Sequence, residues 1–386
     1  MSDKINEKYN LSDRFPLGFW NYTKAGTLNA EESVKDWQDL GMNLAMSSEC
    51  SCESDKQCII DCLNEAQKRG IKVIVCDRRT NWRNYTESGE EKYKADVLQA
   101  VKDFGSHPAF YAFHIGDEPH IDEWKDMENS LKIVNSVSNG FVNFLPLYDE
   151  NGPEWYGIRY AGYADLIVET AKKTGLKMIC YDFYTQCEYH YDEKGIDDYF
   201  KNLVFFRDIA LRVNAEFWTT LLSVGHWKYR VPTVDDIRWQ IYTAVAHGVN
   251  GILWFFIYER DKDSSYRGSP INCFYEKTPM FYDLSYENRA FIKYYASDFI
   301  GAKLKNVYHV KKIYAGCKEY KPEFLPALNL NRNYGAALII SEFSGAEGDF
   351  LTITNNEQRE IEQVTGEYNG KEFSEWLAPG QLIVLK

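Results

Sequence analysis

The sequence predicts an α/β protein with two parts, a (β/α)8 barrel (a TIM barrel) followed by a small C-terminal all-β sandwich domain. Three observations lead to this prediction. Short apolar runs rich in β-branched and aromatic residues alternate with amphipathic helical segments over the first three quarters of the chain. Eight such runs occur, about thirty to forty residues apart. Near residue 300 the helical segments stop, and short strand-like runs separated by turn signals remain.

We expect the eight barrel strands in the runs 15–23, 41–49, 72–80, 109–118, 140–149, 177–185, 215–224 and 251–259. Several intervening helical segments end in glycine, and Thr233 followed by Asp236 predicts a capping box. An open doubly wound sheet is the alternative. It is disfavoured because the first strand-to-helix turn, NYTKAGTLNA, lacks a glycine-rich phosphate fingerprint. The barrel is expected over residues 1–300 and the β-sandwich domain over 301–386.

The composition describes a folded, acidic protein. Its 386 residues are 45% hydrophobic, which suits one large domain with a modest second one. The formal net charge of -13 argues against a nucleic-acid partner, because phosphate binding needs a basic face. We expect a cytoplasmic protein without a membrane partner, since the N-terminus lacks a signal-like apolar core and no segment has the length of a membrane span. The oligomeric state stays open.

The nine cysteines are expected to be reduced thiols, because an odd number scattered over strand-like and helix-like segments does not suit a disulfide framework. Cys50, Cys52, Cys58 and Cys62 fall close together, and four thiolates can bind zinc. Their CxC and Cx3C spacings differ, however, from the paired CxxC knuckles of structural zinc sites. We therefore expect no metal and no other cofactor.

Polar and aromatic residues gather where the expected strands end. In such a barrel the carboxyl ends of the strands meet on the face that carries the active site. The ends supply Trp20, Glu49, Asp77, Arg79, Asp117, Glu118, Tyr148, Asp149, Asp182, Tyr184, His226, Trp227, Tyr258 and Glu259. Carboxylates in an aromatic cleft suit glycosidic bond cleavage, in which one acid protonates the leaving oxygen and a second carboxylate attacks carbon or activates water.

The stretch GDEP at residues 116–119 is the sharpest of these signals. Pro119 pushes the preceding residue toward extended backbone, so Glu118 is expected to stay on the strand and face the barrel mouth. Gly116 removes a side chain just beneath, which would leave room for a ligand. The bland alternative is an acidic first turn that stabilises the dipole of the helix beginning near Ile121.

The same stretch carries a resemblance to a known family. GDEP resembles the fourth-strand Asn-Glu-Pro of clan A glycoside hydrolases, a group of (β/α)8 barrels that includes the family 42 β-galactosidases. The segments CYDFY and IRWQIYTAVAHGVNGILWFF are similar to barrel glycosidases as well. The resemblance covers roughly residues 10 to 300 and implies that Glu118 is the acid/base, with Asp117 in place of the usual asparagine.

Strand seven departs from that family. Clan A enzymes carry a nucleophilic glutamate at its end, where this chain reads TTLLSVGHW. Glu216 stands at the beginning of the expected strand and therefore on the opposite face. Asp182, at the end of strand six, is our substitute. A pair from strands four and six would suit the ~6.5 to 9.5 Å separation of an inverting enzyme, while a retaining mechanism stays open.

The sequence therefore predicts a glycoside hydrolase acting on an oligosaccharide or glycoside, with Glu118 as general acid and Asp182 as second carboxylate. A sugar platform is expected from Trp20, Tyr184 and Trp227. The further binding residues would be Glu49, Asp77, Arg79, Asp117, His226 and Glu259. Asp77 and Arg79 could equally form an internal ion pair. The rival hypothesis is a non-catalytic carbohydrate-binding barrel, and a scaffold that assembles through its β domain is a third.

Overall fold

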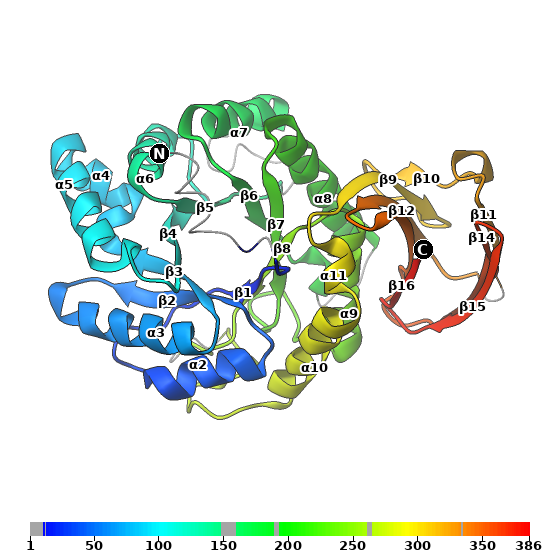
Figure 1. Cartoon of the computed structure of the whole chain (residues 1–386), viewed down its shortest axis with the longest axis horizontal. Coiled ribbons are helices and arrows are strands. Elements are labelled where there is room, and N and C mark those ends of the chain that lie inside the picture. The colour runs from blue at the N-terminus through cyan, green and yellow to red at the C-terminus, as the bar shows by residue number, and fades with distance from the viewer. Residues whose placement is uncertain (1–10, 12, 148–159, 189–192, 261–264, 333–334) are drawn as a thin grey trace.

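The computed structural model describes residues 11–386 except 12, 148–159, 189–192, 261–264 and 333–334. Eight parallel strands form a ring with helices around it, and a second β structure lies beside the ring (Figure 1). The predicted (β/α)8 barrel with a C-terminal β domain is therefore confirmed. Among the residues that the structure describes, no helix combines the length and apolar character that crossing a membrane requires.

The barrel strands are shorter than the apolar runs that predicted them. They are β1 Leu17–Phe19, β2 Leu44–Cys50, β3 Lys72–Asp77, β4 Phe110–Asp117, β5 Gly140–Phe144, β6 Met178–Asp182, β7 Glu216–Leu222 and β8 Gly251–Phe255. Their order around the ring is β1-β8-β7-β6-β5-β4-β3-β2. Asn43 joins the two ends of this order, since its backbone N–H donates to the Leu17 carbonyl (3.0 Å) and its side chain accepts from the Leu17 N–H (2.9 Å).

The helices cover the outside of the ring. They are α2 Ala30–Asp39, α3 Lys56–Lys68, α4 Trp82–Ser88, α5 Glu90–Ala100, α6 Trp124–Val137, α7 Tyr160–Thr174, α8 Glu193–Val213, α9 Val234–Ala246, α10 Pro279–Tyr294 and α11 Ala296–Phe299. The predicted capping box is present at α9, where Thr233 and Asp236 each bond the other's backbone N–H. Pro279 opens α10, the position where its missing N–H costs nothing.

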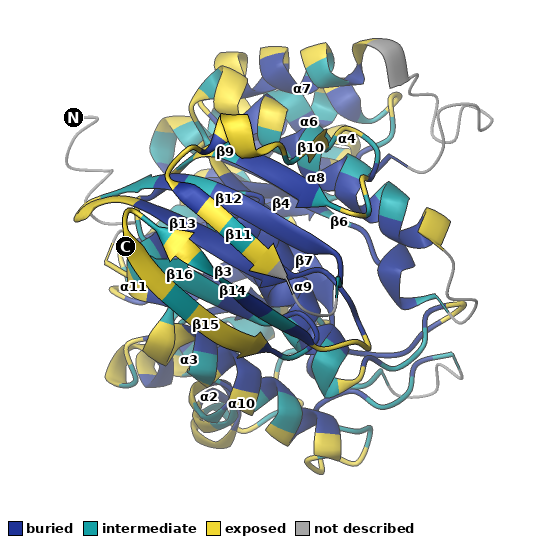
Figure 2. Ribbon diagram, turned by 90° about the vertical axis from the view of Figure 1, so that its right-hand side faces the viewer, coloured by how far each residue is buried: buried dark blue, intermediate teal, exposed yellow. Residues whose placement is uncertain are grey.

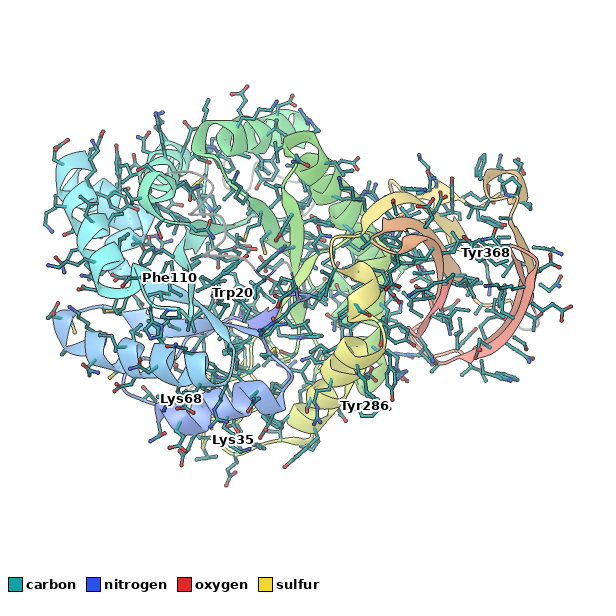
Figure 3. All side chains as sticks on the ribbon, in the orientation of Figure 1. Trp20, Lys35, Lys68, Phe110, Tyr286 and Tyr368 are labelled. Atoms are coloured by element: carbon teal, nitrogen blue, oxygen red, sulfur yellow. The ribbon has the colours of Figure 1, made fainter. Side chains whose placement is uncertain are left out.

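The inside of the barrel is a packed core. Trp218 of β7 stacks on Tyr111 of β4 with ring centroids 6.1 Å apart and planes 13° apart. Trp20 lies within the ring of strands (Figure 3), is only 3% exposed, and donates its indole N–H to the Thr220 hydroxyl of β7 (3.0 Å). Because side chains fill the interior, a ligand can enter only above this level, at the carboxyl ends of the strands.

The C-terminal domain contains two sheets. One has the order β10-β9-β12-β13-β16 and the other β11-β14-β15. The strands are β9 Lys303–Val310, β10 Lys318–Glu319, β11 Leu328–Arg332, β12 Leu338–Gly345, β13 Gly348–Asn355, β14 Glu362–Tyr368, β15 Lys371–Leu377 and β16 Leu382–Leu385. Figure 2 shows β15 largely exposed and β12 largely buried, which is the pattern expected where one sheet faces the barrel.

The β domain is fixed against helix α9 of the barrel. The Trp239 indole N–H donates to the Asn356 side chain (3.1 Å), and the Ser341 hydroxyl donates to the Ala246 carbonyl (2.7 Å). Gly380 makes the closest approach, because a Cβ built there would lie 2.4 Å from the Cα of Trp239. Its φ of +72° also favours glycine. The two parts therefore pack with backbone-to-backbone contact.

Gly380→Ala should weaken this packing more than the backbone conformation alone would. Gly370, in the turn between β14 and β15, offers a matched control, because its φ is +77° and nothing lies within 4 Å of a Cβ there. We expect Gly370→Ala to lower the free energy of unfolding by about 1–2 kcal/mol. Gly380→Ala should add ~1–3 kcal/mol of overpacking to that cost. Denaturant unfolding measures both, and equal losses would contradict the close contact.

Candidate active site

Three carboxyl groups meet at the carboxyl ends of β4 and β6. Asp117 is the last residue of β4 and lies opposite Asn143 of β5 in the parallel register, while Asp182 is the last residue of β6. The Asn143 side-chain amide donates to both carboxylates, at 3.1 Å to Asp117 and 2.6 Å to Asp182. One amide nitrogen therefore holds the predicted strand-four and strand-six acids together.

Glu118 joins this cluster with a backbone different from the predicted one. Strand β4 ends at Asp117, and Glu118 has φ +47°, so the expectation that Pro119 would keep it extended on the strand is wrong. Its N–H donates to the Asn143 carbonyl (3.0 Å), which continues the β4–β5 pairing and fixes this turn. Its carboxyl group lies close enough to Asp182 and Asp117 for their charges, after burial, to raise its pKa.

The space beside Gly116 belongs to the protein rather than to a ligand. Gly116 has φ +145°, and a Cβ built there would lie 2.0 Å from the ring of Trp82. Trp82 opens helix α4 and is buried. The expectation that this glycine leaves room for a substrate is therefore wrong, since the indole fills that room and supports the end of β4 from outside.

The three carboxyl groups cannot all be charged at neutral pH. Burial, then Asp182 and Asp117, raise the pKa of Glu118 to about 9. Burial and then Asp182 raise the pKa of Asp117 to about 7. Burial also raises the pKa of Asp182, while the hydrogen bond from Asn143 opposes that rise. Desolvation and like charge act in the same direction, so the cluster keeps protons that isolated carboxyls would lose.

Aromatic rings line the space next to the acids. Tyr22, which is 38% exposed, lies edge-on to Phe255 at the end of β8, with ring centroids 5.9 Å apart. Phe255 in turn stacks on Tyr184, with centroids 5.4 Å apart. The Arg260 guanidinium lies 4.0 Å above the Tyr22 ring centre. Trp20 lies below Tyr22, stacked at 6.2 Å, and is buried. Tyr22 is therefore the ring that a ligand can reach.

His226 and Trp227 follow β7 and differ sharply in exposure. His226 is 2% exposed and stacks on Tyr266 with ring centroids 5.3 Å apart. Trp227 is 71% exposed and has φ +46°, so its indole projects from the loop. Tyr184 is buried edge-on against His226, with centroids 5.9 Å apart. The structure thus brings the predicted Tyr184 and His226 together and leaves Trp227 at the rim.

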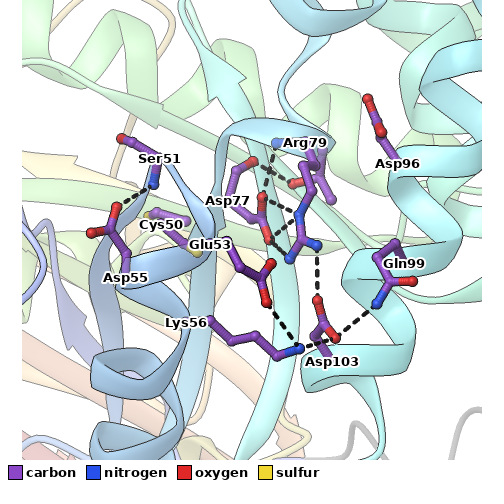
Figure 4. Close-up of polar contacts among 12 residues, drawn as sticks. Cys50, Ser51, Glu53, Asp55, Lys56, Asp77, Arg79, Asp96, Gln99 and Asp103 are labelled. Carbon is purple, nitrogen blue, oxygen red and sulfur yellow. Dashed lines mark hydrogen bonds and ion pairs between the residues drawn. The ribbon is translucent and has the colours of Figure 1, made fainter.

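Asp77 and Arg79 form an internal ion pair (Figure 4), one of the two alternatives that the sequence left open. The Arg79 guanidinium donates to Asp77 (2.7 Å) and to Asp103 (2.8 Å), whose side chains are 0% and 4% exposed. Lys56 completes the network with a 2.6 Å bond to Asp103. These charges neutralise one another beneath the end of β3.

The remaining predicted residues lie apart from the acid cluster. Glu49 is exposed on β2, and its backbone pairs with Lys24. Glu259 accepts a hydrogen bond from the Ser269 hydroxyl (3.0 Å) in the loop after β8. Tyr258 accepts from the Trp37 indole (2.7 Å) and is buried against helix α2. Tyr148 and Asp149 fall outside the described residues.

The end of β7 carries no carboxylate. Leu222 ends the strand, and the Gln240 side chain of α9 both donates to and accepts from its backbone (3.1 and 2.8 Å). Glu216 begins β7, as predicted, and accepts from the Trp218 indole (2.9 Å) at the opposite end of the barrel. The place of the clan A nucleophile is therefore occupied by apolar and amide groups.

Sequence reasoning missed Asn143, Tyr22 and Arg260. Asn143 was hidden because the run GFVNFLPLYD was assigned as one strand to residue 149, whereas β5 ends at Phe144. A buried amide near the end of an apolar strand was the available signal. Tyr22 follows the very short β1 in sequence. Arg260 lies in the charged run ERDKD, whose composition is typical of a solvated loop.

No family model and no curated protein matches the sequence. The solved structures that match include a GH5_18 from Bifidobacterium longum subsp. infantis, with 11% identity over 73% of this chain and 80% of that one and a TM-score of 0.55. A β-galactosidase from the psychrophilic Marinomonas ef1 matches with 11% identity over 71% and 59% of the two chains and a TM-score of 0.51.

A polyextremophilic β-galactosidase from the Antarctic haloarchaeon Halorubrum lacusprofundi matches with 11% identity, 72% and 58% coverage and a TM-score of 0.52. This chain thus spans less than two thirds of either β-galactosidase. At such identities the likeness shows the fold, a TIM barrel of the kind found in glycoside hydrolases. The specific resemblance to family 42 is not confirmed.

Replacing Arg79 should destabilise the fold, because the buried Asp77 would lose its counter-ion and Asp103 would keep only Lys56. We expect Arg79→Leu to lower the free energy of unfolding by about 3–5 kcal/mol. The neighbouring Arg78 is the matched control, since it pairs with Glu87 across 3.3 Å and both side chains are 61% exposed. Arg78→Leu should cost under ~1 kcal/mol. Denaturant unfolding of the two variants measures the difference, and equal costs would contradict the network's structural role.

The acid cluster should make the fold less stable as the pH rises. Between the ordinary pKa of a glutamate, 4.5, and about 9, the folded protein holds a proton on Glu118 that the unfolded chain releases. The free energy of unfolding therefore falls with rising pH in this window. We expect Glu118→Gln to raise the melting temperature relative to the parent protein by at least ~2 °C more at pH 9 than at pH 5.

The exposed Asp122, five residues beyond the end of β4, supplies the control for that experiment. Calorimetry of Asp122→Asn should give a curve parallel to that of the parent protein across the same pH range. If the Glu118→Gln curve were parallel too, Glu118 would not carry the raised pKa.

Proposed function

We propose that this protein is a glycoside hydrolase that cleaves an oligosaccharide or glycoside at the carboxyl ends of its barrel strands. The observation that carries the proposal is the cluster of Asp117, Glu118 and Asp182 held around Asn143 beside accessible aromatic rings. Paired carboxyl groups with raised and unequal proton affinities are what general acid catalysis of glycosidic cleavage requires.

Glu118 would act as the general acid. Its pKa of about 9 keeps it protonated at neutral pH, so it can give a proton to the departing glycosidic oxygen. Asp182 would be the second carboxylate, because the 2.6 Å hydrogen bond from Asn143 favours its charged form. It would either activate a water molecule or bond directly to the anomeric carbon. The separation of the two carboxyl groups in a substrate complex decides between these courses.

Asp117 would exchange protons together with the other two acids of the site. Its pKa of about 7 lies below that of Glu118, and the amide of Asn143 that it accepts from also bonds Asp182, which ties the protonation of the two aspartates together. An uncharged Asp117 lets Asp182 stay ionised at lower electrostatic cost, since like charges in a desolvated site raise each other's pKa. Its place in a fourth-strand motif that otherwise carries asparagine is consistent with this role.

Aromatic side chains would bind the sugar through their faces. Tyr22 after β1 and Trp227 after β7 are exposed rings, and Tyr184, through Phe255, and His226 would support them. Arg260 over the Tyr22 ring could donate to a substrate hydroxyl or carboxylate. Asp77 and Arg79 would support the site indirectly, because their charges are already paired with each other and with Asp103.

A second function is favoured by one specific observation, the missing carboxylate at the end of β7. A barrel that lost its nucleophile could still bind sugars through the same rings without cleaving them. The two functions would use the same residues and differ in whether Glu118 and Asp182 take part in a reaction. Substitution of the acids separates them, because it would abolish cleavage in a hydrolase and change only affinity in a binding protein.

The first experiment is hydrolysis of a panel of aryl glycosides and short oligosaccharides by the purified protein. The panel should contain β-galactosides, since two structural neighbours are β-galactosidases, and β-mannosides, since the GH5_18 from Bifidobacterium longum subsp. longum ATCC 55813 was solved in complex with Manb1-4GlcNAc. We expect cleavage of one sugar class, reduced at least ~10²-fold by Glu118→Gln and by Asp182→Asn.

Asp122→Asn, on the exposed side of the same loop, should leave the rate unchanged. Saturable sugar binding by calorimetry without cleavage of any panel member would overturn the hydrolase and favour the binding barrel. Cleavage that survives in Glu118→Gln would remove Glu118 from the mechanism.

A further inference from the structure

A second cluster of reactive side chains lies between the barrel and the β domain, away from the acid cluster. It consists of His247, which caps the C-terminus of α9, His309 on β9, and Cys317 in the turn before β10. Both histidines are 0% exposed, and the cysteine is half-buried. Among the residues that the structure describes, this is where three His, Cys, Asp or Glu side chains bring one ligand atom each within 4.8 Å of one another.

The distances are close to those of a metal site. The Nε2 atoms of His247 and His309 lie 3.0 Å apart, and Cys317 Sγ lies 4.0 Å from His247 Nε2. Around a tetrahedral zinc ion with bonds of about 2.0–2.1 Å to nitrogen and 2.3 Å to sulfur, two nitrogens are roughly 3.3 Å apart and nitrogen and sulfur roughly 3.5 Å. Side-chain shifts of a few tenths of an ångström would bring these two pairs of atoms to the separations around zinc, and Cys317 Sγ lies within 4.8 Å of the His309 nitrogen.

The His247 imidazole is oriented by its far side. His247 Nδ1 lies 2.8 Å from the Thr243 carbonyl, so this nitrogen carries the proton and Nε2 keeps a lone pair. His309 Nδ1 is buried without a hydrogen-bond partner. With its proton on Nε2, His309 donates a hydrogen bond to His247 Nε2 across 3.0 Å. With its proton on Nδ1 instead, both Nε2 lone pairs are available to an electron-pair acceptor between the rings.

The surroundings hold the rings in place. Phe200 of α8 packs against both imidazoles, with ring centroids 5.0 Å from His247 and 4.8 Å from His309. Burial lowers the pKa of both histidines, that of His309 to about 4, so the rings are neutral, the form in which imidazole binds metals. Burial raises the pKa of the Cys317 thiol to about 12, with Arg207 opposing that rise, so a metal ion binding there would displace the thiol proton.

We propose that His247, His309 and Cys317 form a binding site for a borderline-soft transition-metal ion, with Zn²⁺ as the ion of best fit, that links the barrel to the β domain. Two imidazole nitrogens and one thiolate are donors that zinc prefers, and a water molecule on the half-buried Cys317 side would complete four-coordination. Because one ligand comes from the barrel and two from the β domain, the ion would stabilise the packing between them.

Cobalt titration of the purified full-length chain, after chelator treatment and removal of any histidine tag, tests the site directly. Tetrahedral Co²⁺ bound by a thiolate gives a near-ultraviolet charge-transfer band together with intense visible bands, which solvent-exposed carboxylates do not give. We expect one equivalent of Co²⁺ to produce both bands and one equivalent of Zn²⁺ to abolish them. Competition with a chromophoric chelator then gives the zinc affinity.

Cys317→Ser should remove the charge-transfer band and weaken zinc binding at least ~10²-fold, because it deletes a ligand. Cys273→Ser is the matched control, since Cys273 is also a half-buried free thiol but lies outside the cluster. Zn²⁺ should raise the melting temperature of the parent protein and of Cys273→Ser, but not that of Cys317→Ser.

Absence of the bands in the parent protein, or their survival in Cys317→Ser, would overturn the site and leave the histidines as a hydrogen-bonded structural pair. None of these readouts depends on sugar cleavage, so this proposal and the proposed hydrolase activity stand or fall separately.

Discussion

The constraint on which the upper face of the barrel depends is the burial of three carboxyl groups around a single amide donor. Parallel pairing places Asn143 of β5 opposite Asp117 of β4 and Cys180 of β6, its amide reaches Asp182 two residues further along β6, and the turn at Glu118 adds a third acid. Within the part of the chain that the structure describes, no ion pair neutralises these acids as Arg79 neutralises Asp77 and Asp103. The electrostatic cost is met by retaining protons, and retained protons are what an acid catalyst needs.

The ion-pair network beneath β3 offsets the electrostatic cost of burying carboxyl groups with cations instead of retained protons. The Asp77 and Asp103 side chains are 0% and 4% exposed, and Arg79 and Lys56 neutralise them at distances of 2.6–2.8 Å. Such pairing keeps carboxylates ionised and leaves them with little capacity to exchange protons with a ligand. Position at a strand end does not distinguish the two groups, because Asp77, Asp117 and Asp182 all end strands. Pairing with a cation does distinguish them, and it separates acids with a structural role from acids that can exchange protons.

The barrel itself could be predicted from the sequence because its strands are buried on both faces and therefore read as apolar runs with helical segments between them. The ends of those runs were harder to place. FLPLYD continues the apolar pattern of β5 beyond Phe144, which concealed Asn143 as an end residue. Proline usually favours extended backbone in the residue before it. That rule failed at Glu118, because the hydrogen bond from its N–H to the Asn143 carbonyl fixes the backbone conformation there.

Contacts between distant segments could not be predicted at all. Trp82 fills the space beside Gly116 from a helix that follows a different strand, and no local pattern in either segment announces the contact. His247 and His309 are 62 positions apart in sequence and meet only because the β domain packs on α9. Spacing rules for zinc sites detect ligands that are near one another in sequence. They therefore point to the cysteines of residues 50–62 and not to His247, His309 and Cys317.

The end of β7 shows how the rest of the barrel limits the chemistry that this site can perform. Gln240 satisfies the backbone of Leu222 from α9, and buried residues follow, so an acid introduced there would lose solvation without gaining a cationic partner. In the proposed hydrolase the second carboxylate would then come from another strand, and Asp182 is already oriented by the amide that also holds Asp117. The proposed catalysis would therefore depend on how one amide divides its hydrogen bonds between two acids, because that division favours the charged form of one over the other.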